Sequence, residues 1–243
     1  MTKSFISPDD LRARFSRAMS EMYRKEVPAY GTLLELVRDV NERVLAADPA
    51  LRKQLEETDN LERISEERHG AIRLGGPDEL TQVAALFAAF GMYPVGFYDL
   101  RDADSPVPVV STAFRPVDRD ELDRNPFRVF TSMLATADPR FFTPQLRRRV
   151  ERFVAQRQLF DPALIATARR IEAHGGCPAE QAGEFVRNAV QAFALSTEPI
   201  DRGWYDELSR VSAVAADIAG VASTHINHLT PRVLDIDDLY ARM

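Results

Sequence analysis

The stretch that decides the fold is Arg68-His69-Gly70-Ala71-Ile72-Arg73-Leu74-Gly75-Gly76-Pro77. Its first part is short and flanked by glycine, and Gly75-Gly76-Pro77 is a turn signal, so we expect a β-strand over residues 69–74. Side chains on a strand alternate between its two faces. His69, Ala71 and Arg73 should therefore share one face, where a metal-binding imidazole and a guanidinium stand with only a small side chain between them.

The residues that follow predict a compact α+β unit over residues 66–134. An amphipathic helix is expected over residues 78–90 and ends at Gly91. Aromatic and β-branched residues then predict strands over 93–100, 107–115 and 127–134. Tyr93, Phe97 and Tyr98 belong to this aromatic set and are expected in the core.

Helical segments are expected on both sides of this unit. In residues 1–60, one helix begins at Ser7-Pro8-Asp9-Asp10 and another covers about 32–47. Residues 220–232 read as a second histidine-bearing strand, and the few residues after Asp235 leave little room for a last helix. We interpret residues 1–243 as a single domain. Its large helical insertion, residues 144–218, is expected to contain helices over 144–158, 161–174, 178–196 and 201–218.

Composition and charge exclude several classes of protein. The chain has 243 residues, 45% of them hydrophobic and 28% charged, which is close to the average of globular proteins. Its net charge of -6 argues against general nucleic-acid binding, which needs a basic face. The N-terminus lacks the apolar run of a signal peptide, and no stretch has the ~18 consecutive apolar residues of a membrane span. We expect a cytoplasmic protein with no membrane partner.

Cys177 is the only cysteine. The chain therefore forms no internal disulfide, and a cysteine-ligated zinc or iron–sulfur site is excluded. Cys177 precedes Pro178 at an expected helix start, where a thiolate could be stabilised. The simpler interpretation is a structural cysteine.

The chain has four histidines: His69, His174, His225 and His228. His174 precedes Gly175-Gly176 at a helix end, which favours a structural role. On a strand, His225 and Asn227 would face one way and His228 would face the other way with Ile226. Only one of the two would then bind a metal, and the other, like Asn227, would support the site. For His69 the competing interpretation is a satisfied core histidine, with Arg73 paired to Glu66 or Glu67.

The two histidine segments carry a resemblance to a known family. Arg68-His69-Gly70-Ala71-Ile72-Arg73 and Thr224-His225-Ile226-Asn227-His228-Leu229-Thr230-Pro231-Arg232 resemble the 2-oxoadipate dioxygenase/decarboxylase family over nearly the whole chain. The resemblance implies a vicinal-oxygen-chelate-like mixed β core with N-terminal helices. It also implies iron(II) held by two histidines and a glutamate. His69 and His225 match the histidine ligands, and Arg73 matches an arginine that binds the substrate.

The activity implied by the resemblance is the conversion of 2-oxoadipate and O2 to D-2-hydroxyglutarate and CO2 in lysine degradation. The family's glutamate ligand lies downstream of the second histidine, whereas residues 229–243 contain no glutamate. Asp235, Asp237 and Asp238 are carboxylates, but they lie too close in sequence to be assigned to the metal. We therefore expect the chain to be truncated, the front portion of a longer metalloenzyme domain.

Two other interpretations remain open. A glyoxalase-like lyase or isomerase would use the same fold with zinc, nickel or manganese and without O2. A truncated relative would fold, and could form a homo-oligomer, without catalysing a reaction. Metal analysis with an anaerobic assay separates the first from the dioxygenase, and metal titration of histidine variants tests the second.

Overall fold

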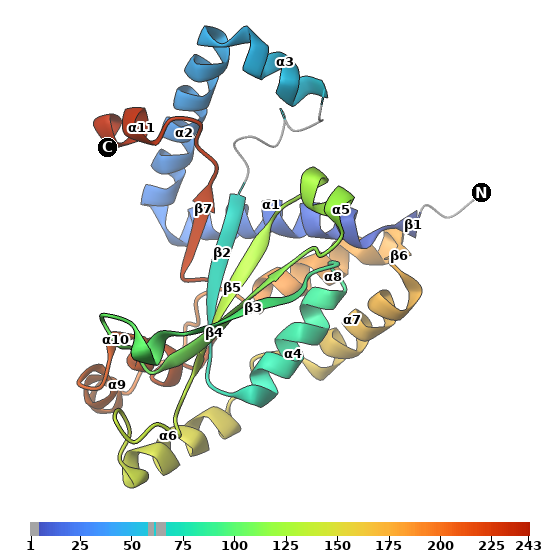
Figure 1. The fold of residues 1–243 in the computed structure, drawn as a ribbon. Helices are drawn as coiled ribbons and strands as arrows, with labels where there is room; N and C mark the ends of the chain where they lie inside the picture. The colour runs from blue at the N-terminus through green and yellow to red at the C-terminus, as the bar shows by residue number, and fades with distance from the viewer. Residues whose placement is uncertain (1–4, 58–60, 62–66) are drawn as a thin grey trace.

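The computed structural model describes residues 5–57, 61 and 67–243, and a five-stranded sheet forms its centre, in the order β3-β4-β5-β2-β7 (Figure 1). β2 and β5 are parallel, and the other neighbouring pairs are antiparallel. This mixed sheet confirms the α+β fold expected from the sequence. The strands are β2 Glu67–Leu74, β3 Tyr93–Asp99, β4 Val109–Arg115, β5 Arg128–Leu134 and β7 His228–Pro231.

Helices surround the sheet in three groups (Figure 1). The first lies along the sheet and consists of α1 Pro8–Glu26, α4 Pro77–Ala88, α7 Pro162–His174 and α8 Ala179–Gln191. The second consists of α2 Pro28–Ala47, α3 Pro49–Glu57 and α11 Ile236–Arg242, near one end of β2 and β7. The third consists of α6 Pro144–Gln156, α9 Arg202–Ser209 and α10 Ala213–Ala219, near the other end.

Shorter elements complete the part of the chain that is described. They are β1 Phe5–Ile6 paired with β6 Cys177–Pro178, the 3-10 helix η1 Leu100–Asp102, and α5 Arg119–Arg124. None of the described helices is long and apolar enough to cross a membrane.

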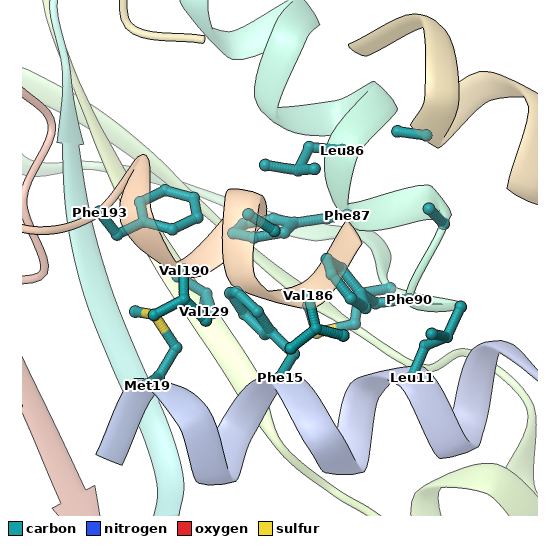
Figure 2. Close-up of a cluster of buried hydrophobic side chains, with 14 of the residues drawn as sticks. Leu11, Phe15, Met19, Leu86, Phe87, Phe90, Val129, Val186, Val190 and Phe193 are labelled. Carbon is teal, nitrogen blue, oxygen red and sulfur yellow. The ribbon is translucent and has the colours of Figure 1, made fainter. Parts of the chain in front are cut away.

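The main hydrophobic core lies between the sheet and the first group of helices. Figure 2 shows Phe15 of α1, Phe87 of α4 and Phe90, just after α4, packed together with Val129 of β5. The rings of Phe15 and Phe90 are stacked with centroids 4.5 Å apart. All four side chains are almost fully buried. Burying a side chain of this size stabilises the fold by about 1.5–3 kcal/mol. One face of the sheet is therefore buried against these helices. Side chains that could react or bind a ligand are expected on the other face.

Several elements differ from the sequence-based expectation. The expected helix over 201–218 is two helices, because the chain breaks after α9 and Ser212 caps α10 by accepting a hydrogen bond from the Val214 amide at 3.1 Å. The last helix does form, because Asp235 caps it through the Asp238 amide at 2.9 Å. The aromatic side chains expected in the core are exposed, since β3 is the edge strand: Tyr93, Phe97 and Tyr98.

Gly75 lies where the chain leaves β2 and approaches α6 closely. A Cβ atom on Gly75 would lie 2.5 Å from Cγ2 of Val154, whereas one on Gly76 would have its nearest neighbour at 4.0 Å. We expect Gly75→Ala to lower the free energy of unfolding by about 1–3 kcal/mol, the usual cost of overpacking. Gly76→Ala is the matched control and should cost less than about 1 kcal/mol. Urea denaturation measures both, and equal losses would contradict the prediction.

Candidate functional site

The second face of β2 carries the residues that the sequence singled out. His69, Ala71 and Arg73 are partly exposed, whereas Gly70, Ile72 and Leu74 alternate with them and are buried. The expected alternation over residues 69–74 is thus observed. We call the surface formed by His69, Ala71, Arg73 and their neighbours on the adjacent strands the site face.

β5 extends the site face beside β2. In the parallel register, Arg128 lies opposite His69, Phe130 opposite Ala71, and Ser132 opposite Arg73. The rings of His69 and Phe130 meet edge to face with their centroids 5.5 Å apart. At the far end, Leu134 is buried in the cluster that contains α10. Helix α10 therefore closes one end of the site face.

His228 lies beside His69, with ring centroids 5.6 Å apart. This corrects the expectation that His228 faces the opposite way together with Ile226. Ile226 is buried on the core side, where its Cδ1 would lie 2.8 Å from a Cβ on Gly70. The alternation is broken because two successive residues pair with Ala71. The backbone amide of Asn227 donates to the Ala71 carbonyl at 2.8 Å, and His228 lies opposite Ala71 in the strand register. β7 begins only at His228, so the expected strand is shorter.

His225 lies at the α10 end of the site face, beside Asp217. Its Nε2 atom is 3.4 Å from Oδ1 of Asp217 and 3.3 Å from Nδ2 of Asn227, which also donates to Oδ2 of Asp217 at 2.8 Å. Arg73 forms an ion pair with the same carboxylate. Asp217 therefore joins two elements of the site that are far apart in sequence.

Sequence reasoning missed Asp217. A charged residue inside the apolar run Val214-Ala215-Ala216-Asp217-Ile218 was the available signal, because an acid among buried helix residues needs a partner. The observed partner of Arg73 is Asp217, in place of the expected Glu66 or Glu67. Glu67 accepts a hydrogen bond from the hydroxyl of Tyr30 at 2.9 Å, and Glu66 lies outside the described residues.

Burial and nearby positive charges lower the pKa of two histidines on the site face, His69 and His228. Burial, the neighbouring His228 and the positive charges of Arg128 and Arg68 lower the pKa of His69. Burial and the charge of Arg73 lower the pKa of His228. At neutral pH both imidazoles therefore have a lone pair that can bind a metal ion.

Two opposing effects act on the pKa of Asp217. Burial alone would raise the pKa of its carboxyl group, but the interactions with His225, Arg73 and Asn227 outweigh burial and lower the pKa. The group is therefore a carboxylate at neutral pH. It supplies the negative charge that balances the guanidinium of Arg73.

Buried polar contacts hold the segment that carries His225. The hydroxyl of Thr224 donates to the carbonyl of Arg73 at 2.5 Å. Arg157, after α6, donates to the carbonyls of Ile218 at 2.5 Å and Val221 at 3.0 Å. Arg157 also forms a two-point contact with Glu79 of α4, with nitrogen–oxygen distances of 2.7 and 2.8 Å. This contact ties α4, α6 and the loop after α10 together.

The remaining polar candidates have structural roles. His174 lies at the end of α7, with its Nδ1 2.6 Å from the carbonyl of Arg170. Cys177 is buried, which raises the pKa of its thiol. Asp235 caps α11, and Asp238 pairs with Arg242 at 3.0 Å.

The site face carries side chains that can bind a metal ion, but the described residues do not form a complete metal site. Neutral imidazoles are good ligands for iron(II) and related ions. Buried Oδ1 of Asn227 has no hydrogen-bond partner among the described residues and so remains available to a ligand. Within residues 5–57, 61 and 67–243, no group of three or more His, Cys, Asp or Glu side chains is close enough to hold a metal.

A family model, described as 2-oxoadipate dioxygenase/decarboxylase, matches residues 15–243. The chain belongs to this family. A 2-oxoadipate dioxygenase/decarboxylase of Mycobacterium tuberculosis is 65% identical over 238 residues, which are 98% of this chain and 56% of that protein. A protein of the same name from Pseudomonas putida is 45% identical over 98% of this chain and 51% of its own length. The chain thus spans about half the length of these relatives.

Solved structures agree with the family assignment. The hydroxyglutarate synthase of Pseudomonas putida in complex with 2-oxoadipate superposes with a TM-score of 0.91 at 44% identity, over 98% of this chain and 52% of that chain. A glyoxalase-superfamily protein from Ralstonia eutropha has a TM-score of 0.58 at 18% identity, over 86% of this chain and 65% of that chain. This second likeness shows the fold alone and agrees with the expected vicinal-oxygen-chelate-like core.

Proposed function

We propose that the protein is an iron(II)-dependent dioxygenase/decarboxylase that converts 2-oxoadipate and O2 to D-2-hydroxyglutarate and CO2. One observation carries the proposal: in a member of this family, Arg73 and the neutral imidazole of His69 share one partly exposed face of β2. The atoms balance, because the carboxylate next to the keto group leaves as CO2, one oxygen atom of O2 enters the carboxylate newly formed at the keto carbon, and the other enters the new hydroxyl group. The six-carbon chain loses one carbon.

His69 and His225 would hold the metal. Asp217 supports this choice, because a carboxylate beside an imidazole is the usual device that orients a metal-binding histidine. When bound, iron(II) would supply the site for the 2-oxo acid and for dioxygen, and the redox chemistry between them. His228 borders the same space next to His69. It would limit the room around the substrate.

Arg73 would bind the carboxylate next to the keto group. A guanidinium offers two parallel donors to a carboxylate and so sets its orientation. The ion pair with Asp217 holds the Arg73 side chain at the α10 end of the site face before substrate arrives. Such positioning holds the reacting carbon in a defined orientation. Correct orientation of the reacting groups accounts for much of the rate enhancement by enzymes.

Oxygen uptake tests the proposed activity. With iron(II) loaded, the protein should consume O2 only when 2-oxoadipate is present, with CO2 and D-2-hydroxyglutarate formed in equal amounts. The glyoxalase-like fold favours a second candidate, a metal-dependent lyase or isomerase that needs no O2. Turnover of 2-oxoadipate under argon would support that candidate and overturn the dioxygenase.

The assignment of the second histidine has its own test. We expect His225→Ala to weaken cobalt(II) binding by more than about 100-fold, because a ligand is lost rather than a supporting group. His228→Ala should weaken it by less than about tenfold. Calorimetric titration with cobalt(II) measures both variants. The reverse order would give the ligand role to His228, which lies nearer to His69 than the sequence suggested.

A further inference from the structure

The register of β7 against β2 decides how the histidines of the site face meet. The ladder between the two strands has four residue pairs, and its register shifts between Glu67 and His69. At its other end, Asn227 and His228 both pair with Ala71. A slip of one residue turns every side chain of a strand to the opposite face. A ladder this short, irregular at both ends, needs contacts from outside the sheet to fix its register.

Two tyrosines at the junction of α1 and α2 supply such contacts. The hydroxyl of Tyr23, in the last turn of α1, donates to the carbonyl of Asn227 at 3.0 Å. The hydroxyl of Tyr30, in the first turn of α2, donates to Oε1 of Glu67 at 2.9 Å. Each bond therefore ends at one of the two irregular positions of the ladder, one just before β7 and the other in β2.

The two tyrosines are also held to each other, and we call them the tyrosine clamp. Their rings meet edge to face with centroids 4.9 Å apart. The turn between them is closed at Val27, whose amide donates to the carbonyl of Tyr23 at 2.8 Å and whose carbonyl accepts from the amide of Tyr30 at 2.9 Å. Tyr30 and Glu67 are only 4% and 8% exposed, so water competes little for their hydrogen bond. The tyrosine clamp thus connects the two histidine segments through one rigid turn.

We propose that Tyr23 and Tyr30 are positioning residues, which fix the register of β7 against β2. In this way they set the placement of His225 and His228 relative to His69. The inference rests on the proposed function, in which His69 and His225 hold the metal. Groups that bind a metal must be held within about 0.5 Å of the productive geometry, so a small displacement of one segment weakens binding. The two hydroxyl groups act through a backbone carbonyl and a carboxylate of the histidine segments.

Removal of single hydroxyl groups tests the tyrosine clamp. For Tyr23→Phe and for Tyr30→Phe we expect the affinity for cobalt(II) to fall by about 3- to 10-fold, the range of one lost hydrogen bond. Asp161→Ala is the matched control. It removes the cap of α7, which accepts from the amide of Ala163 at 2.7 Å, and so lowers stability to a similar degree away from both histidine segments. Its affinity for cobalt(II) should stay within about twofold of the parent protein.

Calorimetric titration and urea denaturation measure the affinity and the stability of the three variants. A fall in cobalt(II) affinity that is equal in Asp161→Ala and in the tyrosine variants would overturn the proposal, because it would then follow from lost stability alone. Unchanged affinity in both tyrosine variants would overturn it as well.

Variants of Glu67 separate the hydrogen bond from the charge. Glu67→Gln keeps a side-chain oxygen that can accept from Tyr30, and its cobalt(II) affinity should stay within about threefold of the parent protein. Glu67→Leu leaves the hydroxyl of Tyr30 without this acceptor and should lose at least as much affinity as Tyr30→Phe. Equal losses in the two Glu67 variants would assign the effect to the charge and contradict the proposal.

The placement of the histidines can also be measured without metal. The ring centroids of His69 and His228 are 5.6 Å apart, close enough for a nuclear Overhauser effect between ring protons. In metal-free protein this signal should weaken when Tyr23→Phe and Tyr30→Phe are combined, and it should persist in Asp161→Ala. A parent protein that binds no cobalt(II) would contradict the proposed function, whereas the ring signal would still test the tyrosine clamp. An unchanged signal in the double variant would overturn the inference on its own.

Discussion

His69→Ala is expected to abolish both turnover of 2-oxoadipate and tight binding of cobalt(II). His69 is the imidazole that faces Arg128, Phe130 and His228 on the site face, and its lowered pKa keeps it neutral. Alanine has no side-chain nitrogen that could bind a metal ion at this position of β2. Oxygen uptake and calorimetric titration with cobalt(II) measure the two losses.

His174→Ala is the matched control for His69→Ala. His174 is exposed at the end of α7 and contacts the carbonyl of Arg170. Its removal should leave both oxygen uptake and cobalt(II) affinity unchanged. The two histidine variants should also unfold at similar urea concentrations, because His69 is half-buried and no hydrogen bond of its side chain is observed with the described residues. Full activity of His69→Ala would refute its role as a ligand.

Arg157→Ala is expected to lower the free energy of unfolding by about 3–5 kcal/mol, the cost of leaving one member of a buried ion pair alone. The side chains of Arg157 and Glu79 are only 4% and 7% exposed. The variant also loses the hydrogen bonds to the carbonyls of Ile218 and Val221. Because these bonds hold the loop between Asp217 and His225, we expect metal affinity to fall together with stability.

Arg147→Ala on α6 is the control for Arg157→Ala. Arg147 pairs with Glu151 at 2.7 Å, but both side chains are 45% exposed. An exposed pair of this kind contributes less than about 1 kcal/mol. A double variant, Arg157→Met with Glu79→Leu, should recover part of the lost stability because no buried charge remains. Urea denaturation compares the three proteins, and equal losses for Arg147→Ala and Arg157→Ala would contradict the prediction.

Local pattern was sufficient for the elements that present the site. The alternation of residues 69–74 predicted β2 and placed His69 and Arg73 on one face, as observed. Helix starts with strong caps were also found, for example Ser7 before α1 and Asp161 before α7. These features depend on neighbours within a few residues, which the sequence displays directly.

Local pattern failed where a distant partner decides the geometry. The alternation over 225–228 predicted opposite faces for His225 and His228, but the pairing of both Asn227 and His228 with Ala71 shifts the phase. The short helices α3 and α5 were missed. A helix of nine residues or fewer has a weak periodic signal, and packing stabilises it instead.

The sequence by itself determined that β2 carries an imidazole and a guanidinium on one face, because strand alternation is a property of the backbone alone. It also carried the motifs through which the family is recognised. Only the tertiary structure brought Asp217 to Arg73 and His225, His228 to His69, and Arg128 level with His69. Each of these contacts joins segments far apart in the chain. Which such segments meet is decided by sheet register and by the packing of α10, and no local pattern encodes either.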